Sequence, residues 1–232
     1  MIIHLCFKYI LYRQRPFLKI SGKIFFVDIK VDVSKNFQEV VTQLQNNHIP
    51  FYITGSLAMN YYLTGQINLV INKRDDIDIV VSSKSIPLVE HVFNQKFIQV
   101  PNSDGTKINH LEANEKIDIS LFNDFLVNKV KIDFSSNQKL FLETKQVSVN
   151  KVTFNLANTR LLLALKLTLF RGASVNEPCD KKDVADFKKF YLLENPLQDE
   201  LETIVPKVIS DPQFITEIIE LFTERYNRIT QL

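Results

Sequence analysis

Two short segments of this 232-residue chain share a pattern that restricts the fold around them. The first is Asp76-Ile77-Asp78-Ile79, and the second is Lys116-Ile117-Asp118-Ile119. Successive side chains of a β-strand point to opposite faces, so in each segment the isoleucines share one face and the aspartates lie on the other. The sequence therefore predicts two strands that pack their isoleucine faces on helices and keep their aspartate faces polar.

The aspartates of these strands are candidate metal ligands. Asp76 and Asp78 place their β-carbons roughly 6–7 Å apart on one strand face. Two carboxylates at this spacing repel each other unless a cation lies between them. If the strand of Asp118 lies beside the first strand, three carboxylates converge and could hold two divalent ions. The alternative is two half-exposed strands with solvated carboxylates, because such short patterns are common.

A glycine-serine pair upstream adds a phosphate-binding feature. Residues 51–54 predict a short buried strand, Gly55-Ser56 interrupts it, and a helix is expected over 57–63, ending at Gly65. Glycine allows a ligand to approach the backbone, and the helix N-terminus offers N–H groups to phosphate. Alternatively, Gly55 only forms a tight turn and Ser56 only caps the helix. Together with the carboxylates, the turn indicates a site for a metal-bound nucleotide.

The order Gly-Ser, Asp-x-Asp and a later strand aspartate resembles the nucleotidyltransferase superfamily. The interval of 20 residues from Ser56 to Asp76 resembles the AbiEii-type toxins and the substrate-modifying transferases of antibiotic resistance. This resemblance implies an α+β fold, a nucleotidyltransferase-like palm of mixed sheet with flanking helices. By motif match, Gly55 and Ser56 hold phosphate, and Asp76, Asp78 and Asp118 bind metal, with Asp118 as the candidate base.

The same resemblance implies an activity, a cofactor and partners. It implies transfer of a nucleoside monophosphate from a nucleoside triphosphate to a hydroxyl of RNA, of a protein or of a small molecule, with Mg²⁺ or Mn²⁺. The toxin type also implies an antitoxin protein as partner. Two features depart from the family pattern: Arg74 stands where Ser or Thr is usual, and Leu57 follows Ser56 without further small residues. They leave open an altered substrate or a weakened enzyme.

The character of the chain changes at Asn158. From there on, the sequence predicts only helices, with Asn158 and Asp211 as caps and Pro212 in a first turn. The chain thus divides into an α+β palm domain over 1–156 and a helical C-terminal domain over 157–232. The helices are expected at about 159–171, 181–193, 198–209 and 212–229. Other elements are expected as strands near 17–33 (with a bend at Ser21-Gly22), 97–101, 107–112, 116–122, 146–149 and 152–154, and as helices over 36–47 (capped by Ser34) and 85–95.

Two segments of the helical half carry a second resemblance. The helix after Asn158 contains Lys166, and Asp183 and Asp186 lie at the start of a later helix. AbiEii-like proteins show a similar helix with a lysine, followed by a Lys-Asp-x-x-Asp segment. The resemblance implies that Lys166 meets the triphosphate and that Asp183 supports it or the metal site. Alternatively, Lys166 extends from a helix edge into water, and the two aspartates stabilise a helix start.

Charge and composition limit the remaining function classes. The 28 basic and 26 acidic residues give a net charge of +2, which argues mildly against a large RNA footprint. The two distant cysteines, Cys6 and Cys179, favour free thiols, and the segment 1–11 lacks the features of a signal peptide or membrane span. We therefore expect a cytoplasmic protein without a membrane association. The alternatives to an active enzyme are a catalytically weak or inactive nucleotide- or partner-binding module on the same fold and a helical interaction protein.

Overall fold

The computed structural model describes residues 17–20, 23–26, 30–72, 75–101, 107–123, 125–169 and 197–231. Its centre is a seven-stranded mixed sheet in the order β12-β13-β4-β6-β9-β8-β7. The strands are β4 (Phe51–Ile53), β6 (Ile77–Val81), β7 (Ile98–Pro101), β8 (Lys107–Asn114), β9 (Ile117–Leu121), β12 (Thr144–Val149) and β13 (Val152–Ala157).

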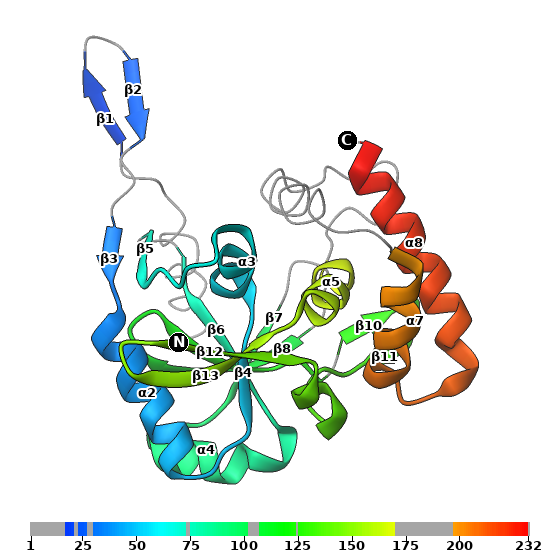
Figure 1. Ribbon diagram of the computed structural model, residues 1–232, viewed down its shortest axis with the longest axis horizontal. Helices are drawn as coiled ribbons and strands as arrows, with labels where there is room; N and C mark the ends of the chain where they lie inside the picture. Colours follow the sequence, from blue (N-terminus) through cyan, green and yellow to red (C-terminus); the bar gives the residue numbers. More distant parts are fainter. Residues whose placement is uncertain are drawn as a thin grey trace.

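Helices lie on both sides of this sheet, which confirms the predicted α+β fold class (Figure 1). Helices α2 (Ser34–Asn46) and α4 (Ile86–Phe93) lie on one side, and α3 (Gly55–Thr64) and α5 (Thr159–Thr168) lie on the other. A 3-10 turn, η1 (Ser83–Ser85), leads into α4. The sheet is thus a layer between two pairs of helices.

The two strands predicted from the Asp-Ile pattern are central neighbours. Strand β6 pairs in parallel with β9, and their isoleucines are fully buried. The buried residues of α2 recur every three to four positions, so they lie on one face of the helix. This face packs in the core with the buried isoleucines, which recur every two positions along their strands. The buried residues of α2 are Phe37, Val40, Val41 and Leu44.

The described residues also form three two-stranded sheets. Strands β1 (Phe17–Ile20) and β2 (Lys23–Phe26) pair antiparallel, so of the strand or hairpin that 17–33 suggested, the structure has the hairpin. Strands β3 (Lys30–Asp32) and β5 (Val70–Asn72) also pair, as do β10 (Phe125–Val127) and β11 (Val130–Ile132). Neither β5 nor the β10–β11 hairpin was predicted.

Helix ends show which capping predictions hold. Asn158 caps α5, because its Oδ1 accepts from the Leu161 N–H at 2.9 Å. Gly65 ends α3 in the left-handed conformation, as predicted. The prediction for Ser34 is wrong: Ser34 is the first residue of α2, and its N–H donates to Asp32 Oδ1 at 2.9 Å. The carboxylate two residues upstream supplies the oxygen that Ser34 was expected to supply.

The described C-terminal residues form helices that pack on α5. They are α7 (Leu197–Val208), the 3-10 turn η3 (Pro212–Phe214), which Asp211 caps, and α8 (Ile215–Gln231). Helices α5, α7 and α8 contact one another and bury a shared apolar face (Figure 1). The helix predicted over 181–193 lies outside the described residues, as do both cysteines. No helix among the described residues combines the length and apolarity that a membrane span requires.

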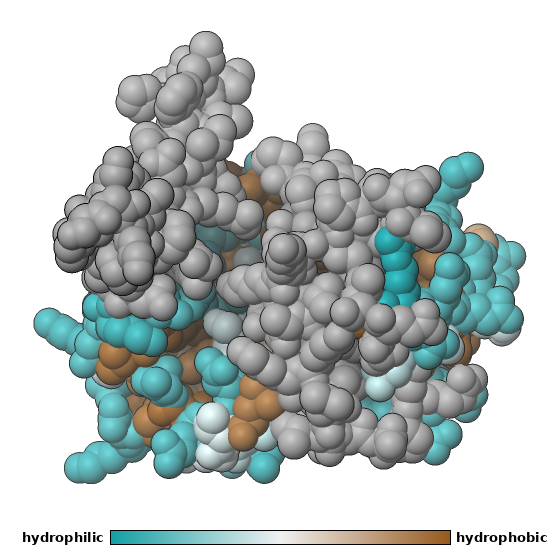
Figure 2. Space-filling model, turned by 90° about the horizontal axis from the view of Figure 1, so that it is seen from above, coloured by the Kyte–Doolittle hydropathy of each residue, from teal (hydrophilic) through white to brown (hydrophobic). Residues whose placement is uncertain are grey.

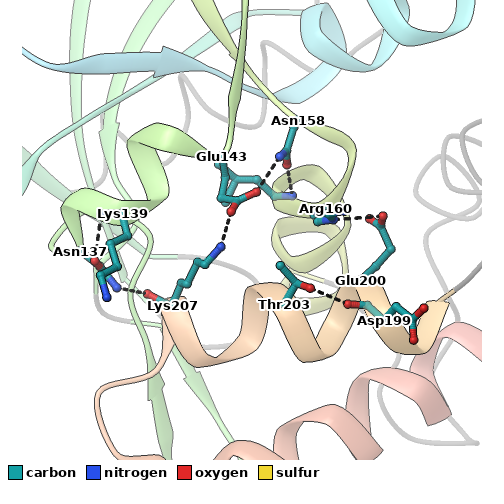
Figure 3. A network of polar contacts seen from close by, with 10 residues as sticks. Asn137, Lys139, Glu143, Asn158, Arg160, Asp199, Glu200, Thr203 and Lys207 are labelled. Atoms are coloured by element: carbon teal, nitrogen blue, oxygen red, sulfur yellow. Dashed lines mark hydrogen bonds and ion pairs between the residues drawn. The ribbon is translucent and has the colours of Figure 1, made fainter.

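A polar network joins α5 and α7 to the sheet (Figure 3). Its centre is Glu143, which follows the 3-10 turn η2 (Gln138–Leu142) and precedes β12. The Asn158 amide donates to Glu143 Oε2 at 2.7 Å, and the Lys207 ammonium of α7 donates to Glu143 Oε1. Nearby, Arg160 Nε donates to Glu200 Oε1 at 3.1 Å.

Exposed large hydrophobic residues come from separate elements. Figure 2 shows hydrophobic and hydrophilic residues interspersed where the described part of this face is visible. The exposed residues are Val70, Leu88, Ile98, Leu126 and Leu142. Isolated apolar side chains of this kind are ordinary on a protein surface and do not define an interface.

Candidate active site

The carboxylates predicted to converge lie on neighbouring strands. Asp78 of β6 lies directly opposite Asp118 of β9, and Asp118 lies opposite Glu112 of β8. These three side chains therefore form one row across the sheet, on the face away from the buried isoleucines. The prediction that the strand of Asp118 neighbours the strand of Asp78 is confirmed.

A second row begins one step earlier on the same face. Asp76 precedes Asp78 by two residues, and Lys116 precedes Asp118 by two. The Ile77 N–H donates to the Lys116 carbonyl at 2.9 Å, and Lys116 Nζ lies 3.0 Å from Asp76 Oδ1. The Lys116 side chain is only 5% exposed, whereas that of Asp76 is 41% exposed. A buried ammonium thus neutralises the partly exposed carboxylate of Asp76.

The glycine-serine turn lies against the first row. The Thr54 N–H donates to the Asp78 carbonyl at 2.9 Å, which holds the end of β4 beside β6. Gly55 has a φ of +65°, and a Cβ atom added there would lie 2.1 Å from Asp78 Oδ2. Ser56 is partly buried in the first turn of α3. The structure therefore brings Gly55, Ser56 and Asp78 together.

The packed carboxylates change the acidity of Asp118. Burial, followed by the negative charges of Asp78, Asp76 and Glu112, raises the pKa of Asp118 to about 8, although the charge of Lys116 opposes the rise. At pH 7 without a bound cation, the Asp118 carboxyl is therefore largely protonated. A divalent cation at this place would favour its ionised form.

A histidine completes the surroundings of Asp118. His110 lies two residues from Glu112 on β8, and its Nε2 is 3.6 Å from Asp118 Oδ1. Burial lowers the pKa of His110, while the charges of Glu112 and Asp76 act in the opposite direction. The histidine is therefore neutral at pH 7, and the contact is not an ion pair in the absence of a cation.

The donor atoms suit a hard divalent cation. Carboxylate oxygens are the ligands that Mg²⁺ and Mn²⁺ prefer, and the carboxylates of Asp76, Asp78 and Asp118 gather on this face beside the Lys116 ammonium. Within the described ranges, no set of three or more His, Cys, Asp or Glu side chains is arranged to hold a metal ion. Asp76 and Asp78 fit a metal that takes its remaining ligands from the phosphates of a nucleotide.

The other predicted site residues are only partly placed. Lys166 lies in the last turn of α5 and is partly exposed. Helix α5 contacts α3, the helix that begins with Gly55 and Ser56. Asp183 and Asp186 lie outside the described residues. The roles implied for Lys166 and Asp183 at a triphosphate remain predictions.

Three neighbours of the site were not singled out from the sequence: Lys116, Glu112 and His110. Lys116 precedes β9 in a turn, where its φ of +66° interrupts the alternation of a strand, so the sequence pattern did not assign its side chain to a face. Glu112 and His110 needed the register of the β8–β9 hairpin. A bulge between Glu112 and Asn114 shifts that register, so counting from the turn would not have paired Glu112 with Asp118.

Comparisons with known proteins add similarities of overall arrangement. No family model matches the chain, and no curated protein matches it. Among solved structures, the antibiotic-resistance factor ANT(2'')-Ia matches with a TM-score of 0.44 at 10% identity, over 87% of this chain and 97% of that one. An antigenic nucleotidyltransferase-like protein from Paracoccidioides brasiliensis matches with a TM-score of 0.42 at 14% identity, over 88% and 94%.

A third similar structure is the lincosamide antibiotic adenylyltransferase LnuA in its lincomycin-bound form. It matches with a TM-score of 0.41 at 11% identity, over 69% of this chain and 98% of that one. These identities and TM-scores are low, so the role of no residue in this chain follows from them.

Proposed function

We propose that this chain is a metal-dependent nucleotidyltransferase that transfers a nucleoside monophosphate from a nucleoside triphosphate to a hydroxyl. One observation carries the proposal: Asp78 and Asp118 lie opposite each other on parallel neighbours, beside the glycine that begins α3. A phosphate-binding helix start and a pair of carboxylates within one site are the two parts that such a transfer needs. The resemblance of the sequence motifs to the nucleotidyltransferase superfamily supports the same reaction.

The residues divide the work according to their chemistry. Asp76 and Asp78, with Asp118, would hold Mg²⁺ or Mn²⁺, which would supply positive charge for the triphosphate and for the departing pyrophosphate. Gly55 lets the Asp78 carboxylate lie against the start of α3, and the first N–H groups of that helix would be available to a phosphate. Ser56 adds a hydroxyl donor.

Asp118 is the residue we assign as proton acceptor. The acceptor oxygen forms a bond to the α-phosphorus, the bond between the α-phosphorus and the bridging oxygen breaks, and pyrophosphate leaves. The proton of the attacking hydroxyl passes to the Asp118 carboxylate. Asp118 can accept this proton only in its ionised form, which a bound divalent cation would favour, and it lies opposite Asp78 on the neighbouring strand.

The acceptor is a hydroxyl of RNA, of a protein or of a small molecule. The balance of 28 basic against 26 acidic residues supplies little excess charge for many phosphate contacts, which favours a compact acceptor over a long RNA. A toxin role of AbiEii type, with an antitoxin partner, rests on the motif resemblance. Lys166 is assigned to the triphosphate on the same basis.

A second function has one observation in its favour. Lys116 already pairs with Asp76, and the described residues contain no ready cluster of three metal ligands. A protein with this arrangement could bind a nucleotide or a partner without catalysing transfer. Transfer of a labelled nucleotide distinguishes the enzyme from this binding module.

The test is label transfer from each radiolabelled nucleoside triphosphate with Mg²⁺ or Mn²⁺, in cell lysate and with purified protein alone. We expect transfer by the wild type and none by the Asp76→Ala/Asp78→Ala double variant. Glu115→Ala is the matched control, because it removes an exposed carboxylate in the β8–β9 turn. Transfer that survives the double variant contradicts the assignment of the site. Nucleotide binding without transfer supports the binding module, and no nucleotide binding contradicts both.

A further inference from the structure

Three lysines in turns between paired strands have similar left-handed φ angles. The φ angle is +66° at Lys116, +66° at Lys129 and +68° at Lys151. Lys129 and Lys151 are exposed, as expected for a charged side chain at a turn, whereas the Lys116 side chain is 5% exposed. The removal of an ammonium from water is unfavourable unless another charge compensates it. The turn itself therefore does not explain why Lys116 points inward.

The compensation comes from the carboxylate face. Lys116 Nζ contacts Asp76 Oδ1 at 3.0 Å, one row away from the opposed pair Asp78 and Asp118. Lys116 therefore supplies positive charge at the place where carboxylates would otherwise repel one another. A divalent cation that binds Asp76 must compete with this ammonium.

We propose that Lys116 is a resident counter-cation that competes with free divalent metal for Asp76, so that tight metal binding requires the nucleotide. This inference rests on the proposed function. Without nucleotide, the ammonium lowers the attraction of the site for a second positive charge. A triphosphate adds several negative charges and restores that attraction. Metal and nucleotide then strengthen the binding of each other, by the same factor in both directions.

The test measures the affinity of the intact protein for Mn²⁺ from the decrease of the free-ion signal in electron paramagnetic resonance. In the absence of nucleotide, Lys116→Met should bind Mn²⁺ at least about tenfold more tightly than the wild type. Lys116→Arg keeps the charge and should bind as weakly as the wild type. Lys129→Met and Lys151→Met are controls of the same residue type and backbone conformation, and should leave the affinity unchanged.

A second measurement uses the wild type and does not depend on how any variant folds. Analogues of the four nucleoside triphosphates with a methylene group between the α- and β-phosphorus cannot transfer. At least one should raise the Mn²⁺ affinity of the wild type, and should raise it more than that of Lys116→Met. If the wild type binds Mn²⁺ equally tightly with and without every analogue, Lys116 does not act as proposed.

Further outcomes separate this inference from the function on which it rests. Circular dichroism and a cooperative thermal transition first establish that Lys116→Met is folded. If the folded variant binds Mn²⁺ no more tightly than the wild type, while Asp76→Ala/Asp78→Ala abolishes binding, the inference fails and the metal site stands. If the double aspartate variant binds Mn²⁺ as the wild type does, the proposed function fails as well.

Discussion

The Asp78 carboxylate occupies the space into which a side chain at Gly55 would extend. A Cβ atom at Gly55 would lie 2.1 Å from Asp78 Oδ2 and 3.2 Å from the carboxyl carbon. The φ of +65° at Gly55 is also a conformation that L-residues avoid. The turn that would receive phosphate and the strand that would hold metal are therefore in direct contact, and a change at one of them displaces the other.

Replacement of Gly55 with alanine should damage both the fold and the site. The left-handed backbone costs about 1 kcal/mol with a Cβ present, and the clash with Asp78 adds roughly 1–3 kcal/mol. We expect Gly55→Ala to lower the free energy of unfolding in urea by this sum and to reduce nucleotidyl transfer at least about tenfold. Gly65→Ala is the control, because Gly65 has a φ of +71° and a Cβ added there would meet no atom within 4 Å. If Gly55→Ala and Gly65→Ala lower the free energy of unfolding by the same amount, the clash with Asp78 does not occur.

The contact between Gly55 and Asp78 can also be tested by a double-mutant cycle. In Asp78→Ala, the oxygen and the carboxyl carbon are gone, and the remaining Cβ at 3.5 Å makes an ordinary contact. Gly55→Ala should therefore destabilise the Asp78→Ala protein by about 1–2 kcal/mol less than it destabilises the wild type. The measurement is urea unfolding of the four proteins. Additive losses would show that the two residues do not interact as the structure indicates.

The raised pKa of Asp118 gives the metal-free protein a characteristic pH dependence. A carboxyl with a pKa of about 8 in the folded state and 3.8 in the unfolded state keeps its proton on folding, so the free energy of unfolding falls as pH rises between these values. Asp118→Asn removes this effect. We expect it to stabilise the metal-free protein by on the order of 2 kcal/mol at pH 8 and to have little effect near pH 4.

Thermal melting in a chelator between pH 4 and pH 9 tests this expectation for Asp118. Glu115→Gln is a control, because its exposed carboxyl in the β8–β9 turn stays in water. If Asp118→Asn and the wild type keep a constant difference in transition temperature over this range, Asp118 does not carry the raised pKa. The direction of the change distinguishes a buried carboxyl from one held by a cation.

The sequence was sufficient for the strands of the site because their signal is local. The alternation in Asp76-Ile77-Asp78 and Ile117-Asp118-Ile119 sets which side chains share a face, and burial of the isoleucines decides which face is internal. That β6 and β9 pair in parallel is a long-range property. The prediction treated it as a condition, and the structure supplies it.

Other features could not be predicted because they depend on partners elsewhere in the chain. Gly55 was assigned to ligand approach, whereas its contact with Asp78 arises from a strand more than twenty residues later. Lys116 stands within the second motif, yet its burial follows from the pairing of two strands. The start of α2 also depends on a residue outside the predicted cap. Asp32 accepts from the N–H of Ser34, and the helix begins at Ser34, two residues before the predicted start at 36.

Hairpin turns show how one signal can be recognised in one place and missed in another. Strands were predicted at 146–149 and 152–154, on either side of Asn150-Lys151, whereas no strands were predicted around Asn128-Lys129, between β10 and β11. In both turns asparagine and lysine have positive φ angles, of +49° at each asparagine. Strands β10 and β11 have three residues each, which is too short for an alternation of apolar and polar residues to be recognised.

The junction between the sheet and the C-terminal helices depends on one carboxylate. Glu143 accepts from Lys207 of α7 and from Asn158, the residue that caps α5 (Figure 3). Burial would raise the pKa of Glu143, but these two hydrogen bonds, with the charges of Lys207 and Arg160, lower it below its ordinary value. An acid whose pKa is lowered on folding stabilises the folded state above its unfolded pKa of 4.5, and this contribution is lost as pH falls through the folded value.

Glu143→Gln should therefore lower the free energy of unfolding by roughly 1–3 kcal/mol at pH 7, because the variant loses a charged acceptor shared by two donors. The difference from the wild type should shrink as pH falls below about 4.5, where the unfolded chain takes up its proton, and disappear at the lower pH at which folded Glu143 takes up its own. Glu200→Gln is the matched control, since its partner Arg160 is 42% exposed and a pair that open to water contributes at most about 1 kcal/mol. Urea unfolding at pH 7 and pH 4 measures the free energy of unfolding of the wild type and of the two variants. Equal losses in the two variants, or a difference for Glu143→Gln that does not depend on pH, would show that Glu143 does not hold α5 and α7 to the sheet.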